Sequence, residues 1–151
     1  QSQFSPVPIT DTFWIVPTWH EVPAQATTVM RLDPGLAFGT GTHPTTRMCL
    51  RWIARNGAVQ PGAGNNPLGR VLDYGCGSGI LAIGAAKFGA TDIDAVDIDP
   101  DALVATQANA RANQVQIQTG CFPRAPSWFC AWLHFPCRSA TRPQRSGHIS
   151  R

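Results

Sequence analysis

The sequence predicts an α/β fold, a partial doubly wound sheet of parallel strands. Two apolar segments, Arg70–Tyr74 and Ile93–Val96, are predicted strands because they are short, apolar and partly β-branched. Each is followed by a helical segment, and three closely spaced glycines join the first strand to its helix. Strands that alternate with helices are typical of parallel sheets with right-handed crossovers.

The chain before this unit is predicted to hold short strands and one helix. Residues 1–8 read as irregular, whereas Phe13–Val16 and Val29–Leu32 read as strands. A helix is predicted from Pro44 to about Arg55, since Pro44 suits its first position. Either Thr42 or His43 can cap it. Its apolar face is either Met48, Trp52 and Arg55 or Cys49 and Ile53.

Two helices and a third strand are predicted after the glycines. Ile80–Phe88 forms the first helix, and Gly89 ends it. The second extends to Ala112 with Asp99 as its cap, and it carries Leu103, Gln107 and Ala110 along one side. The third strand is predicted to begin in the segment 115–117.

The glycines Gly75, Gly77 and Gly79 fall at every second position after the first strand. A glycine inside a strand or helix costs about 0.5–1 kcal/mol relative to alanine, so this spacing favours a sharp turn. A turn without Cβ atoms at a helix N-terminus is typical of a ligand-binding corner. A tight turn without a ligand is the simpler alternative, and the flanking acids favour ligand binding over it.

Two acidic residues narrow the choice of ligand. Asp73 directly precedes the turn, and Asp97 ends the next strand about 20 residues later, in position to bind ribose hydroxyls. A dinucleotide fingerprint would place the third glycine one position later, and Asp73 would repel a pyrophosphate. Asp73 either faces an amino group of the ligand or holds the turn through backbone N–H groups. The sequence favours neither role over the other. S-adenosylmethionine, an adenosine with an ammonium group, fits the pattern best.

Composition indicates a soluble globular domain. The 151 residues are 43% hydrophobic and 14% charged, with a formal net charge of +3 that is too small to indicate nucleic-acid binding. No apolar run reaches the ~20 residues of a membrane span, and no signal peptide is visible, so we expect a cytoplasmic protein. Five cysteines without a C-x-x-C pair indicate free thiols and no metal site.

From about Trp14 to Gln114 the sequence resembles the ribosomal protein L11 methyltransferases (the PrmA family). The resemblance is carried by four runs: the segment 15–20 (IVPTWH), the segment 32–46 (LDPGLAFGTGTHPTT), the segment 73–81 around the glycines, and the segment 97–100 (DIDP). The threonine–glycine–histidine run is much more specific than the glycine turn.

The resemblance implies a class I methyltransferase fold and methyl transfer from S-adenosylmethionine to amino groups of a ribosomal protein. It implies that Thr46, Gly75 and Asp97 contact the cofactor. With the residues of the corner, the predicted cofactor-binding set is Thr46, Asp73, Gly75, Gly77 and Asp97. His43 is more simply a helix cap than a general base, and no catalytic residue is predicted.

The sequence also departs from the family. We expect a linker and N-terminal strand region over residues 1–30, the S-adenosylmethionine-binding half over 31–118 and a divergent, irregular tail over 119–151. The tail is rich in arginine, proline and cysteine, which suggests a shifted reading frame. The family's later strands are missing, so one wall of the pocket is expected to be absent, with weak or no cofactor binding and no turnover.

Two other functions remain as alternatives. The chain could be a non-catalytic fragment that acts through partner binding at an exposed sheet edge or a basic tail. A nicotinamide-dependent oxidoreductase is disfavoured by the early third glycine. The expected partner is a ribosomal protein, with no direct binding to nucleic acid or membrane.

Overall fold

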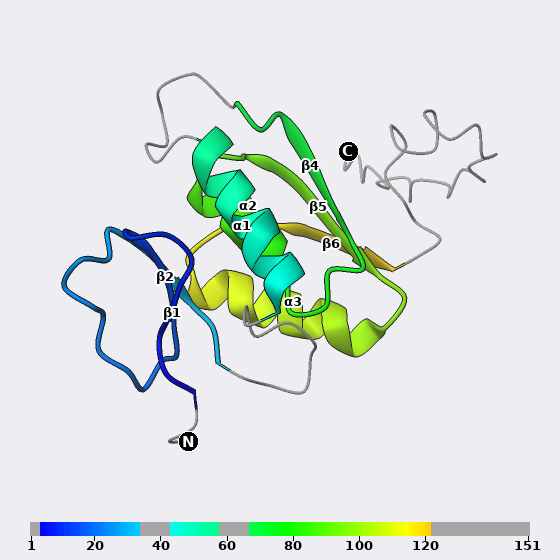
Figure 1. Ribbon diagram of the computed structural model, residues 1–151. Helices are drawn as coiled ribbons and strands as arrows, with labels where there is room; N and C mark the ends of the chain where they lie inside the picture. The colour runs from blue at the N-terminus through cyan, green and yellow to red at the C-terminus, as the bar shows by residue number, and fades with distance from the viewer. Residues whose placement is uncertain (1–3, 34–42, 58–66, 122–151) are drawn as a thin grey trace, which may run out of the picture.

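The structure is a computed structural model that describes residues 4–33, 43–57 and 67–121 (Figure 1). Within these ranges six strands and three helices follow one another. In chain order they are β1 (Val7–Pro8), β2 (Phe13–Val16), β3 (Thr28–Arg31), α1 (Pro44–Asn56), β4 (Arg70–Tyr74), α2 (Ile80–Lys87), β5 (Asp92–Asp97), α3 (Pro100–Ala112) and β6 (Gln118–Cys121). None of the described helices is both long enough and apolar enough to cross a bilayer.

Strands β4, β5 and β6 form a parallel sheet in that order, so the predicted α/β fold is confirmed. The register pairs Asp73 with Ala95 and Asp97 with Cys121. Helix α2 packs on β4 and β5, and α3 packs on β5 and β6. The carboxyl ends of β4 and β5 therefore lie next to each other, which is where a ligand of such a sheet binds.

The third strand begins three residues later than predicted, at Gln118 instead of Val115. The reason is the end of α3, where Gln114 adopts a left-handed conformation (φ 57°) and the N–H of Val115 donates to the carbonyl of Ala110. Residues that complete a helix terminus in this way cannot also pair with a strand. Strand β6 also crosses the boundary expected between residues 118 and 119.

A second sheet has the order β1–β2–β3, with β1 antiparallel and β3 parallel to β2. The prediction that residues 1–8 are irregular was wrong for Val7 and Pro8, which pair with Ile15 and Trp14. Proline can occupy such a short edge strand because no ladder hydrogen bond from its nitrogen is required there.

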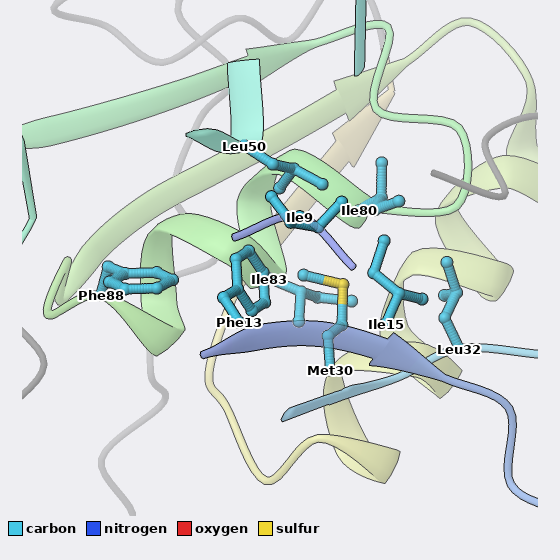
Figure 2. Close-up of a cluster of buried hydrophobic side chains, with 9 residues drawn as sticks. All are labelled: Ile9, Phe13, Ile15, Met30, Leu32, Leu50, Ile80, Ile83 and Phe88. Atoms are coloured by element: carbon cyan, nitrogen blue, oxygen red, sulfur yellow. The ribbon is translucent and has the colours of Figure 1, made fainter. Parts of the chain in front are cut away.

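One hydrophobic core joins this sheet to the helices (Figure 2). Phe13 and Met30 come from the strands, whereas Leu50 and Ile83 come from α1 and α2, and each of the four is at most 1% exposed. The ring of Phe13 meets Phe88 edge-on at a centroid distance of 5.0 Å. The segment before residue 31 thus shares its core with the segment after it.

The buried faces of α1 and α3 agree in part with those predicted. Ile53, from one of the two faces predicted for α1, packs against the core, and Ala110 of α3 is buried. On α1, Leu50 is buried while Met48 and Trp52 are 65% and 60% exposed. Leu50 packs against Gly84 of α2, where a Cβ would lie only 2.6 Å from a Leu50 methyl group. On α3 the buried positions are Ala102, Thr106 and Ala110, with Gln107 exposed.

Candidate functional site

The glycine turn folds over the end of β5. The N–H groups of Gly75 and Cys76 both donate to the carbonyl of Val96, at 2.8 and 3.0 Å. Gly75, Gly77 and Gly79 have φ values of 76°, 54° and 77°, a conformation that residues with a Cβ atom rarely adopt. A Cβ on Gly75 would meet no atom of the described residues within 4 Å, so this backbone is not covered by them. The turn therefore exposes bare backbone at the sheet edge where a ligand is expected.

Asp97 lies beside this turn with both carboxylate oxygens engaged by the backbone. Its Oδ2 accepts from the N–H of Gly77 at 2.9 Å and its Oδ1 accepts from the N–H of Asp99 at 3.0 Å. These backbone hydrogen bonds, with the Asp99 bond contributing most, lower the pKa of Asp97 below its usual value. A carboxylate offers about four lone-pair sites, so the group keeps room for a further donor. The site thus presents an ionised acceptor suited to hydroxyl groups.

Asp73 is buried, with 8% of its surface exposed, and its Oδ2 accepts from the N–H of Ala82 in the first turn of α2 at 3.1 Å. Burial, and to a smaller extent the charge of Asp97, raise the pKa of Asp73. Of the two readings left level by the sequence, the structure supports the backbone-holding one for Oδ2. The charge of Asp97 acts on Asp73, so the two carboxylates lie near each other.

Thr46 is brought towards the same end of the molecule. Leu50 and Ile53 of α1 face Gly84 of α2, and Gly57 faces Phe88, so the two helices run in the same direction. Thr46, one turn before Leu50, therefore lies towards the N-terminal end of α2, where the glycine turn ends. His43 caps α1 by accepting from the N–H of Thr45 at 3.3 Å, as predicted for either His43 or Thr42.

Two residues of this neighbourhood were not predicted from the sequence. Thr106 and Asn109 of α3 donate to the turn, to the carbonyls of Gly77 and Ser78 at 3.0 and 2.9 Å. For Thr106 the sequence signal is the four-residue spacing of the small side chains Ala102, Thr106 and Ala110.

The surroundings fit an adenosine ligand with a positive charge. Tyr74, the last residue of β4, and Ile98, next to Asp97, are 58% and 82% exposed and offer apolar surface for a base. The negative charge of Asp97 suits a ligand that carries a positive group.

Metal binding has no support in the described ranges. No group of three or more histidine, cysteine or acidic residues occurs there, and Cys49, Cys76 and Cys121 are free thiols. Residues 34–42, which are part of the segment 32–46 that carries the family resemblance, and the tail from residue 122 onwards lie outside the described residues.

Comparison with known proteins shows what the chain is similar to. The family described as Ribosomal protein L11 methyltransferase (PrmA) matches residues 1–124. A relative of that name from Polaromonas sp. is 72% identical over 120 residues, which is 80% of this chain and 39% of that protein. One from Thiobacillus denitrificans is 55% identical over 120 residues, 80% of this chain and 38% of that protein. The chain thus spans about two fifths of these relatives.

A solved structure agrees with the sequence comparison. The ribosomal protein L11 methylase from Lactobacillus delbrueckii subsp. bulgaricus has a TM-score of 0.63 and 36% identity, covering 78% of this chain and 57% of that one. The fold class predicted from the sequence, a part of the class I methyltransferase fold, agrees with this neighbour. The chain therefore belongs to the ribosomal protein L11 methyltransferase family.

Proposed function

We propose that the chain binds S-adenosylmethionine at the glycine turn and serves methyl transfer to amino groups of ribosomal protein L11 in the cytoplasm. The observation that carries the proposal is the juxtaposition of open backbone at Gly75 with the ionised carboxylate of Asp97. The names of the relatives support the reaction and the protein substrate. The proposal includes no catalytic residue, no metal and no nucleic-acid partner.

Each predicted cofactor residue has a proposed role. Asp97 accepts hydrogen bonds from the ribose hydroxyls, and Gly75 and Gly77 let the ligand approach the backbone. Asp73 keeps the N-terminus of α2 in place and adds negative charge near the ligand's ammonium group. Thr46 contacts the cofactor from the first turn of α1. S-adenosylmethionine supplies an already activated methyl group, so the chain need only bind and orient.

Calorimetric titration with S-adenosylmethionine tests the proposal. A ligand of about 27 non-hydrogen atoms gains about 0.3 kcal/mol per atom in a complete site, and the described residues form only part of one. We therefore expect a Kd on the order of 0.1–1 mM. Asp97→Ala should weaken binding at least about tenfold, because a hydrogen bond to a charged group contributes about 1.5–3 kcal/mol.

Asp92→Ala is the matched control, since it removes the same side chain from the other end of β5. Asp92 forms an exposed ion pair with Arg70 at 2.6 Å, away from the turn. Such a pair contributes little, so affinity should stay within about twofold of the unsubstituted chain. Equal losses in both variants would contradict the proposed role of Asp97. No saturable binding by the unsubstituted chain would favour the alternative of a non-catalytic fragment, and tighter binding of a nicotinamide dinucleotide would favour an oxidoreductase.

A further inference from the structure

Helix α3 holds the glycine turn through two side chains one helical turn apart. The hydroxyl of Thr106 donates to the carbonyl of Gly77 at 3.0 Å and lies 3.3 Å from the sulfur of Cys76. The amide of Asn109 donates to the carbonyl of Ser78 at 2.9 Å. Three consecutive residues of the turn are therefore tied to one face of one helix.

The same threonine also fills the space beside Gly79. A Cβ on Gly79 would lie 2.8 Å from the γ-methyl carbon of Thr106 and 2.9 Å from its hydroxyl oxygen. Thr106 is fully buried, so its side chain cannot swing aside into solvent. The third glycine of the motif is thus required by the approach of α3, whereas Gly75 faces open space.

Helix α3 is also connected to the acidic side of the site. It begins at Pro100, three residues after Asp97, and its cap Asp99 accepts from the N–H of Asp101 at 2.9 Å. The N–H of Asp99 in turn donates to the carboxylate of Asp97. The middle of α3 therefore contacts the turn through Thr106 and Asn109, and its N-terminal cap contacts Asp97, the predicted ribose acceptor.

We propose that Thr106 and Asn109 are positioning residues that hold the glycine turn in its ligand-binding conformation before the ligand arrives. The inference rests on the proposed function for the identity of the ligand. The hydrogen bonds from Thr106 and Asn109 to the turn, here called the clamp, are present in the ligand-free chain. Three glycines at positive φ have many other conformations available, and the two donors select one of them. Preorganisation of this kind raises affinity because less ordering remains to be done on binding.

Backbone ¹⁵N order parameters of the ligand-free chain test the clamp. Rigid amides have values of about 0.85 and flexible ones fall below about 0.6. We expect the amides of residues 75–79 to be rigid in the unsubstituted chain and flexible in Thr106→Val combined with Asn109→Ala. Asn109→Ala alone, which keeps the buried threonine, should loosen Ser78 and Gly79. Rigid turn amides in both variants would overturn the proposal.

Two further variants separate positioning from general stability. Thr106→Ser keeps the hydroxyl and should keep the turn rigid, although losing a buried methyl group lowers its thermal midpoint. Ala110→Gly weakens the same helix at a buried position that does not touch the turn, so turn amides should remain rigid. If turn mobility follows the thermal midpoint across all four variants, Thr106 and Asn109 are merely structural.

Titration of the same variants with S-adenosylmethionine tests the consequence for binding. We expect the double variant to bind roughly tenfold more weakly and Thr106→Ser to bind within about twofold of the unsubstituted chain. A loosened turn with unchanged affinity would overturn the positioning role while leaving the proposed function intact. Absence of binding by the unsubstituted chain would contradict the proposed function. The order parameters alone would then show whether Thr106 and Asn109 hold the turn.

Discussion

Gly75 shows how one missing side chain defines the site. Its φ of 76° is unfavourable for any L-residue with a Cβ, yet no neighbouring atom of the described chain would collide with one. Packing against the described residues therefore does not explain the glycine at this position. Conformation explains part of it, and the rest is consistent with the ligand contact proposed for Gly75.

Gly75→Ala should therefore lower both stability and cofactor affinity. The left-handed backbone costs an alanine about 1–2 kcal/mol, and the added methyl group projects to where the ligand is proposed to lie. Gly69→Ala is the matched control, because Gly69 also has a positive φ (63°) and open space around it but precedes β4. Urea unfolding should show similar losses for both variants. Calorimetry should show weaker binding for Gly75→Ala alone, and equal affinities would contradict the proposed ligand position.

The lowered pKa of Asp97 predicts a pH-dependent contribution to folding. A carboxyl whose folded pKa lies below its usual 3.8 stabilises the fold above that pH and loses the contribution as pH falls through the folded value. Asp97→Asn should thus be less stable than the unsubstituted chain by a constant margin above about pH 5. The margin should shrink below pH 3.8.

Denaturant unfolding across this pH range measures the margin. The raised pKa of Asp73 acts in the opposite direction, but Asp73 titrates in both proteins and largely cancels in the difference. A margin that stays constant down to pH 2.5, or that grows on acidification, would contradict an ionised, backbone-bonded Asp97.

Among the elements, the clearest successes of the sequence are those with strong local patterns. Strand β4 and the starts of α1 and α3 were predicted at their observed residues, because Pro44 and Pro100 follow capping residues and the glycines limit β4. The faces of α1 and α3 were predicted only in part: Ile53 and Ala110 turn inward as one prediction for each helix had it, whereas the buried positions of Leu50 and Thr106 were missed. No local pattern shows where two helices approach closely. Leu50 against Gly84 and Thr106 against Gly79 are both contacts between distant segments.

Asn113 at the end of α3 is a second example of a tertiary role that no local pattern revealed. Its side chain accepts from the N–H of Arg31 at 2.8 Å and donates to the carbonyl of Arg31 at 2.7 Å, as a neighbouring strand would. It is only 4% exposed. The amide thus joins β3 of one sheet to the helix that packs on the other.

Asn113→Ala should destabilise the chain by about 2–3 kcal/mol, because two partly buried backbone groups lose their partner. Asn56→Ala is the control, since its amide makes one exposed bond to the carbonyl of Trp52 and should cost no more than about 0.5 kcal/mol. Thermal or urea unfolding checks both values. A cost for Asn113→Ala no larger than for Asn56→Ala would show that the two sheets are held together by the core alone.

For the molecule as a whole, the sequence predicted well which residues come together at the site. It predicted less well the packing that supports them. Asp73, Gly75, Gly77 and Asp97 come together because consecutive parallel strands end at the same sheet edge, a rule that needs no knowledge of packing. The sharing of one core by Phe13, Met30 and α2 could not be predicted from the sequence, because the expected division at residue 30 followed the resemblance to the family and not contacts between segments.

The most direct measurement is a ¹H–¹⁵N chemical-shift titration of the labelled 151-residue chain with S-adenosylhomocysteine. We expect saturable shifts at the amides of Gly75–Gly79 and of residues 97–99, with small changes at β1 and β2. Saturable shifts centred instead on the apolar groove between α1 and β4, which Met48, Trp52 and Val71 line, would contradict the proposed site. So would a titration that moves no amide of the turn at millimolar ligand.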